Sequence, residues 1–380
     1  MHLLQRPERG EPLDTTRTSL AGWSAELRAA KQGGGRWRWG LNGRAVSSGF
    51  ETNDLGFQLR SDVASTTGWV GFTHFEPGRI VRRWELWTNT WERWTLDGSR
   101  EQLGTNLWAN VSLQNNWMAM GELQRNFSQH SPTLLRGGPA LYVPPNVTWW
   151  TRIVSDQRRW LSGELITRGS VDDSGGGRRF TVAPMVTLRP SASAEVSLQP
   201  SVTRARNPSQ YVETAFAGDD TSYVIGALTQ TTTSLTARLN LTFSPTLSLQ
   251  LYAEPFLGTG AYEALGEVRD ARARRLARRI APFAVSSIAR LGDELRIDRG
   301  GLRAPITLDD PDFAVRSLKS NAVVRWEYRP GSALFLVWAQ QRDHDDNVAG
   351  VAVSRQAREL WRTAGTNVLL IKASYWLAPR

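Results

Sequence analysis

Residues 234–243 read SLTARLNLTF, and residues 246–254 read TLSLQLYAE. Both stretches have an apolar side chain at every second position, for example Leu239, Leu241 and Leu251, with a polar side chain between. Because successive residues of a strand point to opposite faces, this period of two predicts strands with one apolar and one polar face. The turn-forming sequence Ser-Pro-Thr lies between them, so we expect the two strands to be joined by a short turn.

The same period recurs along the whole chain. Most of the segments span nine to fifteen residues, which exceeds the five or six of ordinary soluble strands and fits the roughly 9–11 that cross a bilayer at a tilt. We expect fifteen strands, at about 20–31, 36–47, 63–75, 80–96, 101–113, 116–127, 146–154, 159–168, 178–189, 193–207, 231–243, 247–256, 315–329, 333–342 and 367–376.

Short connections alternate with long ones. Odd-numbered connections are turns, such as Gly33-Gly34-Gly35 and Pro330-Gly331, whereas most even-numbered connections are long, such as 128–145 and 208–230. Outer-membrane barrels have short turns on the periplasmic side and longer loops outside. A soluble sandwich or propeller has no reason to separate its connections in this way. The sequence therefore predicts an all-β, antiparallel, outer-membrane-type β-barrel.

The composition excludes several other classes. The chain has 46 Lys plus Arg against 36 Asp plus Glu, a net charge of +10, and no Cys. A disulfide scaffold, a thiolate metal site and a cysteine nucleophile are therefore excluded. No run approaches about 18 consecutive apolar residues, so no transmembrane helix is expected. We expect a polar leader or truncation remnant at 1–19 and one barrel domain at 20–380, in which 257–314 form a long external loop region.

The predicted strand count is odd. Bacterial single-chain barrels have an even number of strands, and this chain supplies fifteen, or sixteen if one was missed. Residues 1–19 also lack the apolar core of a secretory signal. We therefore expect the chain to be the C-terminal part of a larger barrel in the outer membrane of a Gram-negative bacterium, with its signal peptide lost by truncation.

Several phrases together resemble one bacterial family, a domain-of-unknown-function barrel that follows a family-nine-type carbohydrate-binding module in outer-membrane proteins. The resemblance implies the same location and an upstream sugar-recognising module, but no reaction. The phrases that carry it are GWSAELRAAKQGGGRWRW (22–39), SSGFETNDLGF (47–57), TRARNPSQYV (203–212), GALTQTTTSLTARLNLTFSPTLSLQLYAEPF (226–256), DPDFAVRSLKSNAVVRWEYRPGSALFLVWAQ (310–340) and NVLLIKASYW (367–376).

Sequence motifs for catalysis are sparse. The four histidines have no second histidine at ligand spacing, and only His344 lies in an acidic cluster, at 343–346. A solvated external loop explains that cluster better than an ion site does. The phosphate-cradling and nucleophile-elbow motifs are missing from the sequence. We therefore expect no catalysis, no cofactor, no resident metal and no nucleic-acid partner.

Basic residues on the polar phase of the strands are candidates to line the inside of the barrel. A barrel of sixteen or more strands leaves an interior wide enough for water or a plug, and a cationic lining favours anionic solutes. Salt bridges with Glu26, Glu254 and Glu327 are the alternative interpretation. The lumen-facing candidates are Arg36, Arg38, Arg44, Arg238, Arg325 and Lys372.

Tryptophan is unusually frequent, with 17 residues against 12 Phe and 7 Tyr. Aromatic residues at strand ends or on apolar phases are typical of the girdles at membrane interfaces. Platforms for sugars are the alternative. The girdle candidates are Trp37, Trp39, Trp84, Trp149, Trp150, Trp326, Tyr375 and Trp376.

One segment of the predicted external loop is strongly basic, with six arginines in the eleven residues 269–279. Contact with anionic lipopolysaccharide or an acidic solute is the functional interpretation, and a solvated loop helix is the alternative. These arginines are Arg269, Arg272, Arg274, Arg275, Arg278 and Arg279.

Three functions remain after these steps. The leading hypothesis is an outer-membrane barrel segment that acts as a pore, receptor or anchor for a sugar-recognising module. Its expected partners are membrane lipid and lipopolysaccharide, with a saccharide or an anionic solute as a further partner. A soluble or periplasmic β-rich carbohydrate-binding protein is the second hypothesis, and a glycoside hydrolase is a minor third.

Overall fold

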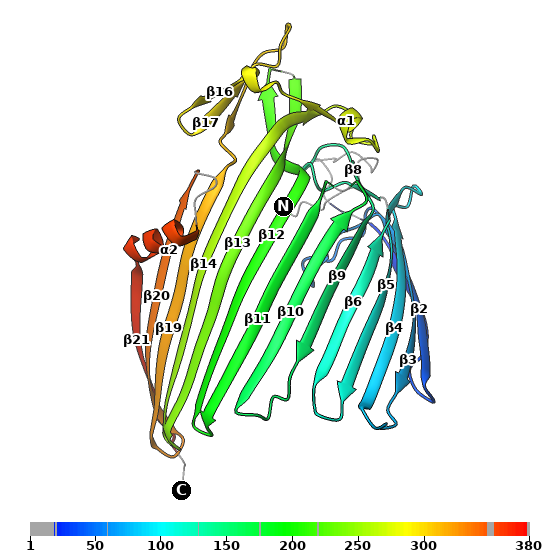
Figure 1. Cartoon of the computed structure of the whole chain (residues 1–380). Coiled ribbons are helices and arrows are strands. Elements are labelled where there is room, and N and C mark those ends of the chain that lie inside the picture. Colours follow the sequence, from blue (N-terminus) through cyan, green and yellow to red (C-terminus); the bar gives the residue numbers. More distant parts are fainter. Residues whose placement is uncertain are drawn as a thin grey trace.

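A computed structural model describes residues 19, 21–58, 60–127, 129–174, 176–218, 220–347 and 353–377. Apart from Ser19, the predicted polar leader lies outside these residues. Fifteen strands form one antiparallel sheet in the order of the chain, with the short strand β15 (Ile280–Pro282) added beside β14 (Figure 1). The fifteen strands are β1 (Ser24–Lys31), β2 (Trp37–Val46), β3 (Val63–His74), β4 (Val81–Trp94), β5 (Arg100–Leu113), β6 (Met118–Asn126), β9 (Asn146–Val154), β10 (Leu161–Asp172), β11 (Arg178–Ser191), β12 (Ala194–Ala217), β13 (Asp220–Ser244), β14 (Leu247–Val268), β19 (Phe313–Arg329), β20 (Ser332–Asp346) and β21 (Thr366–Ser374).

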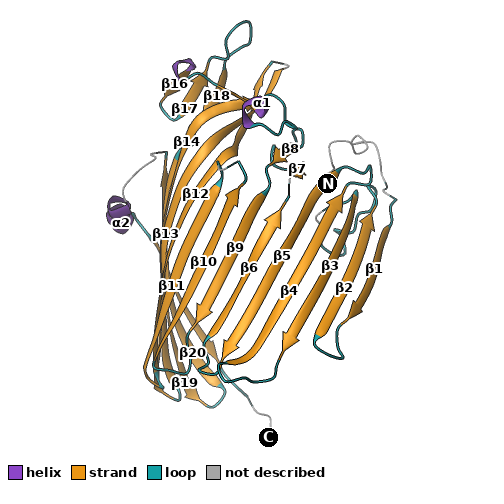
Figure 2. Cartoon of the chain, turned by 45° about the vertical axis from the view of Figure 1, so that its right-hand side comes forward, coloured by secondary structure: helices purple, strands orange, loops and turns teal. Residues whose placement is uncertain are grey.

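Each of the fifteen predicted segments overlaps one of these strands. The prediction of an all-β antiparallel fold is therefore confirmed. Figure 2 shows that the tilted strands form a single curled sheet. Within the described residues, β1 and β21 are the two ends of the sheet and do not pair with each other. Barrel closure, which was part of the prediction, is not seen.

The remaining elements lie at the end of the sheet that carries the long connections (Figures 1 and 2). None of the helices among the described residues is long and apolar enough to cross a membrane. These elements are the hairpin of β7 (Gln129–Ser131) and β8 (Leu141–Val143), the strand β15 (Ile280–Pro282), the small sheet of β16 (Ile288–Leu291), β17 (Glu294–Ile297) and β18 (Ile306–Asp309), the helices α1 (Leu276–Arg279) and α2 (Val353–Arg362), and a 3-10 turn at Val285–Ser287.

The strand register separates an apolar face from a polar face of the sheet. Cross-strand partners point to the same side. The apolar face is defined by the row Leu188, Val196, Leu239, Leu251, Ala322, Trp338 and Leu369. The polar face is defined by the adjacent row Thr187, Ser197, Arg238, Tyr252, Asn321, Ala339 and Val368.

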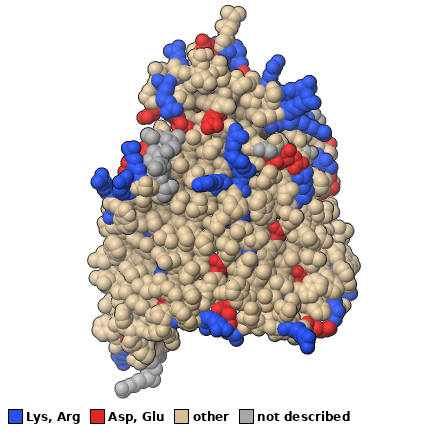
Figure 3. All heavy atoms as spheres, viewed as in Figure 1, with Lys and Arg blue, Asp and Glu red and all other residues tan. Residues whose placement is uncertain are grey.

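The apolar face is left uncovered in its middle. Leu251, Trp338 and Leu369 are 37%, 40% and 67% exposed, although they lie in the interior of their strands. Figure 3 shows few charged side chains across the middle of the sheet and charged groups gathered above and below. We refer to this charge-poor zone as the apolar band. The buried core clusters lie beyond it, among the elements at the long-loop end.

Two stretches that were predicted as loops are instead extensions of the sheet. Residues 208–217 and 220–230 form the upper parts of β12 and β13, and the first twelve residues of the predicted loop 257–314 complete β14. Register shifts at Asn207/Gln210 and Tyr211/Glu213 interrupt the alternation of side chains there. Residues 224–228 are all buried. Strands that are buried on both faces, and strands with bulges, do not alternate apolar and polar residues. The strands predicted from this alternation were therefore shorter than the observed ones.

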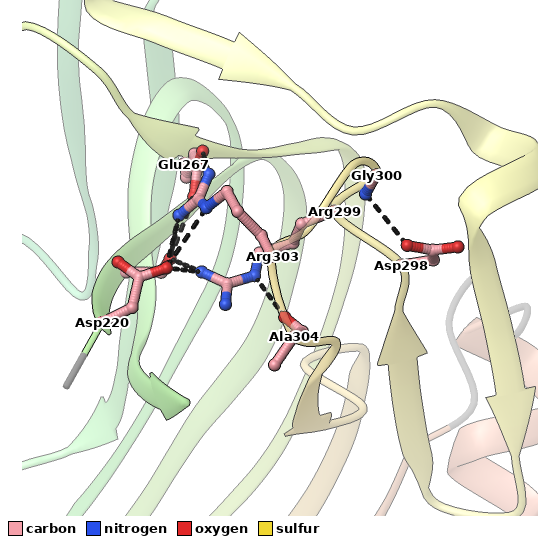
Figure 4. Close-up of polar contacts among 8 residues, drawn as sticks. Asp220, Glu267, Asp298, Arg299, Gly300, Arg303 and Ala304 are labelled. Atoms are coloured by element: carbon pink, nitrogen blue, oxygen red, sulfur yellow. Dashed lines mark hydrogen bonds and ion pairs between the residues drawn. The ribbon is translucent and has the colours of Figure 1, made fainter. Parts of the chain in front are cut away.

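The small sheet of β16, β17 and β18 is fastened to these extensions. Its Ile297, Ile306 and Leu308 pack in one buried cluster with Ala215 and Val224 of the main sheet. This apolar contact holds the small sheet against the main sheet, although no backbone hydrogen-bond ladder joins the two. A charged network, drawn in Figure 4, completes the attachment.

In that network, the Arg299 side chain is 1% exposed, and its Nη1 donates to Asp220 Oδ2 at 2.7 Å and to Ser222 Oγ at 2.8 Å. Arg303 Nη2 donates to Asp220 Oδ2 and to Glu267 Oε2, both at 3.0 Å. The bond from Arg303 holds the pKa of Asp220 below its usual range. Burial raises the pKa of Glu267, but the bonds from Arg303 and Ser222 outweigh it and lower the pKa overall.

Removal of Arg303 should loosen the small sheet in a pH-dependent way. A carboxyl group with a depressed folded-state pKa stabilises the fold above its unfolded pKa, and this contribution is lost as the pH falls through the folded-state value. We expect Arg303→Gln to increase amide hydrogen exchange over 288–309 about threefold to tenfold at pH 7. The difference between the variant and the unmodified protein should shrink at pH 3.

The matched control is Arg296→Gln, because Arg296 is an exposed residue of the same small sheet. It should leave the exchange of 288–309 unchanged. Equal effects of the two variants, or a difference that does not depend on pH, would show that the apolar cluster alone holds the small sheet in place.

Candidate functional site

Five of the six predicted lumen-facing basic residues share the polar face. Followed from strand to strand, the cross-strand partners place Arg238 on β13 and Arg38 on β2 on the same side of the sheet. On the other side of β13, it continues to Arg325 and Lys372. Arg44 lies six residues after Arg38 on β2 and therefore points to the same face. Arg36 precedes β2 and forms an ion pair with Glu76.

Some of these cations have local partners, as the alternative interpretation required. Arg325 Nη2 lies 2.6 Å from Glu327 Oε2. The guanidinium of Arg238 lies 5.4 Å from the ring centre of Tyr252, whose hydroxyl donates to Glu254. Glu26 lies opposite Arg44 in the register but forms its ion pair with Arg28. The polar face is therefore a mixed surface in which several of the positive charges are already partnered.

The predicted aromatic girdle divides between the two faces. Trp37, Trp39, Trp84, Trp149 and Trp326 lie on the apolar face with the leucines of the strands. Tyr375 and Trp376 follow the end of β21 and contact Arg329 and Ser332. Trp150 lies on the opposite side from Trp149, because the two are successive residues of β9. A side chain on the polar face cannot belong to the same belt as Trp149.

Trp150 instead belongs to a group of tryptophans on the polar face that the sequence analysis did not single out. We call this group the tryptophan patch. The register places it across β3, β4, β5 and β9. A usable signal was present in the segment 81–94, VRRWELWTNTWERW, which carries tryptophan on both phases of one strand. The patch consists of Trp69, Trp87, Trp91, Trp108 and Trp150.

Glycines on neighbouring strands lie beneath three of these rings. A Cβ atom added at Gly71 would overlap the ring of Trp87, one at Gly104 would overlap Trp91, and one at Gly40 would overlap Trp69. Each ring therefore lies against the sheet backbone in the space that a cross-strand side chain would fill. Aromatic residues commonly compensate for glycines in strands in this way.

A chain of hydrogen bonds surrounds the patch. Trp150 Nε1 donates to Glu122 Oε2 at 2.8 Å, and Asn106 Nδ2 donates to Glu122 Oε1 at 2.5 Å. Asn106 Oδ1 in turn accepts from Asn89 Nδ2 at 2.7 Å. Trp87 Nε1 donates to Glu85 Oε2 at 3.2 Å. The donors and acceptors of the patch are thus positioned by one another.

The same residues form a shallow pocket of about 420 Å³ on the polar face. Its walls combine aromatic surface with amide and carboxylate groups, which is the usual chemistry of a site for a small polar ligand. No group of three or more metal-ligating side chains occurs within the described residues. The pocket is lined by Glu85, Trp87, Asn89, Asn106, Trp108 and Glu122.

The basic segment 269–279 lies at the long-loop end, around α1 (Figures 1 and 3). Arg269, Arg272, Arg274, Arg275 and Arg278 are exposed. Arg279 is buried, and its Nη1 donates to the carbonyl oxygens of Ala273 and Arg274 at 2.8 and 3.2 Å. Its guanidinium also lies 5.3 Å from the ring centre of Tyr142. Five of the six predicted arginines are therefore exposed, and the sixth stabilises the fold of the loop.

The fold and the patch define a class: an all-β chain built on one continuous antiparallel sheet with an uncovered apolar face. The chain belongs to the family described as Domain of unknown function (DUF5916), whose model matches residues 10–378. No curated protein matches the chain. Among solved structures, a "Bacterial polysaccharide outer membrane secretin" is similar, at 11% identity and a TM-score of 0.34, over 85% of this chain and 87% of that one.

Substitution of Gly71 tests how tightly the rings lie against the sheet. Gly71→Ala places a methyl group where the ring of Trp87 lies, so the ring must move. We expect a loss of about 1–3 kcal/mol in the free energy of unfolding, which is typical of overpacking, with a changed near-UV circular dichroism signal from tryptophan. Urea unfolding measures the stability.

Gly68→Ala is the control on the same strand, because the nearest atom to its Cβ position is Leu41 Cδ1 at 3.8 Å. This variant should be neutral or slightly stabilising. Equal stabilities of the two variants would mean that the ring of Trp87 is not held against the sheet.

Proposed function

We propose that this chain forms the wall of a β-barrel in the bacterial outer membrane and serves as a pore, a receptor or the anchor of a sugar-recognising module, without catalysis of its own. The apolar face contacts lipid, and the polar face borders an enclosed aqueous space. The observation that carries the proposal is the apolar band, where exposed Leu251, Trp338 and Leu369 lie in one cross-strand row that runs from β14 to β21. Large exposed apolar patches mark sites of interaction with protein or membrane.

The arrangement of connections supports the same proposal. Two-residue turns join β11 to β12, β13 to β14 and β19 to β20 at one end of the sheet, and the elements with buried cores lie at the other. In outer-membrane barrels the short turns face the periplasm. The small sheet, α1 and the exposed arginines then lie on the outer surface of the cell.

Closure is the further step that this proposal requires. In hydrocarbon, the unpaired backbone groups of an open sheet edge are too costly to persist. β1 and β21 run in the same direction, because fourteen antiparallel pairings separate them. Direct closure would have to be parallel, so we propose that strands from outside the described residues close the barrel.

The exposed arginines of 269–279 provide a surface for lipopolysaccharide in this setting. Guanidinium groups bind phosphate and carboxylate with paired hydrogen bonds. The segment carries five exposed arginines and one acidic residue, Asp270, which gives it a strong positive charge. We propose that they contact the anionic groups of the lipid at the outer rim.

The tryptophan patch favours one competing function, that of a soluble or periplasmic β-rich carbohydrate-binding protein. Electrophoresis without boiling separates the two. A membrane barrel resists unfolding in dodecyl sulfate at room temperature and migrates differently after heating. We expect this heat-modifiable migration and recovery of the protein in the outer-membrane fraction. Full solubility without detergent would reject the barrel.

A charge placed on either face gives a sharper result. Leu251 lies on the apolar face, and its neighbour Gln250 lies on the polar face. Arginine at the bilayer midplane of a barrel costs about 2–4 kcal/mol, whereas lumenal substitutions cost little. We expect Leu251→Arg to destabilise the protein by about this amount in lipid vesicles, measured by urea unfolding. The control Gln250→Arg should be nearly neutral, and similar losses for both would contradict the proposed orientation.

A further inference from the structure

We propose that the tryptophan patch is a binding site for a neutral oligosaccharide. The inference rests on the proposed function in one respect: the polar face has to border the space through which the solute arrives. The site is the pocket lined by Trp87 and Trp108 with Asn89, Asn106 and two glutamates. Trp69, Trp91 and Trp150 extend the aromatic surface around it.

The orientation of the rings is the first step. Trp87 and Trp91 lie over Gly71 and Gly104, so each indole occupies the space next to the backbone that a cross-strand side chain would fill. Both side chains are half-buried. Both residues lie on the polar face of the sheet and remain partly exposed. An aromatic ring presented in this way offers a flat apolar platform, and the C–H faces of a sugar ring are the matching surface.

The polar groups form the second step. Asn89 lies between Trp87 and Trp91 on β4, and Asn106 is its cross-strand partner on β5. The amide groups are held by hydrogen bonds to each other and to Glu122. Planar amides and carboxylates beside an aromatic platform suit the hydroxyl groups at the edge of a sugar. Because their positions are fixed in advance, little side-chain entropy is lost on binding.

The charge of the pocket selects the ligand class. Among its six lining residues are two carboxylates, Glu85 and Glu122, and no cation. An anionic sugar would bring a like charge against these groups, which is unfavourable. A neutral saccharide can donate its hydroxyl protons to the same oxygens. The pocket therefore differs from the basic surface of 269–279, which suits anions.

Binding is tested with maltohexaose and cellohexaose as probes, added to the detergent-solubilised full chain while tryptophan fluorescence and calorimetric heats are recorded. We expect saturable binding of at least one probe. Trp87→Leu and Trp91→Leu should weaken it about tenfold or more. Trp87→Phe keeps a ring over Gly71 and should retain part of the affinity, even if the leucine variant folds poorly.

Trp149→Leu is the matched control. Trp149 also lies over a glycine, Gly169, but on the apolar face. This variant should bind the probe with unchanged affinity. Equal weakening by Trp149→Leu and Trp87→Leu would overturn the proposal, because it would assign the effect to loss of packing. An absence of saturable binding of both probes would overturn it as well.

An oligogalacturonate of six residues provides the charged probe, and we expect it to bind more weakly than the neutral chains. Tighter binding of this anion would overturn the assignment of a neutral ligand. The proposal of a membrane barrel is tested separately, by heat-modifiable migration. A membrane-inserted protein that binds neither neutral probe rejects the saccharide site alone, whereas a water-soluble protein that binds one rejects the barrel and retains the site.

Discussion

The antiparallel hydrogen-bonded ladder is the constraint on which the structure depends. It fixes the period of side-chain direction at two residues, so that a shift of one position moves every side chain to the other face. Away from local register shifts, cross-strand pairing keeps the same two faces from β1 to β21. Leu239 and Leu251 therefore share a surface with Trp338, while Arg238 and Tyr252 share the other. A two-faced wall results from this alternation without any separate layer of helices.

Where the ladder is regular, the sequence was sufficient to predict it. The segments 231–243 and 247–256 alternate strictly, and both lie within observed strands. Where bulges or burial on both faces occur, the pattern was lost. The shifts near Asn207 and Tyr211 and the continuous burial of 224–228 hid the upper parts of β12 and β13. Periodicity reports on the environment of a strand and disappears when both faces are covered.

The candidate site was predicted only in part. The alternation of side chains predicted that Arg38, Arg238 and Lys372 lie on the polar face, because the face of a residue depends only on its position along its strand. The tryptophan patch depends on which residues meet across strands, such as Gly71 with Trp87 and Asn89 with Asn106. Such pairs follow from register, which one sequence does not specify. Trp150 was assigned to the girdle together with Trp149, although adjacent residues of a strand point in opposite directions.

The two faces divide the chemistry of the protein. Apolar side chains on one side require a partner such as lipid, and amides, carboxylates and half-buried indoles on the other form a pocket. The most direct test of this division is a nitroxide scan of residues 247–254 in lipid vesicles, with oxygen and a water-soluble nickel chelate as relaxation agents. We expect positions 247, 249, 251 and 253 to favour oxygen and the four between them to favour nickel. Similar accessibility at odd and even positions would contradict a wall between lipid and water.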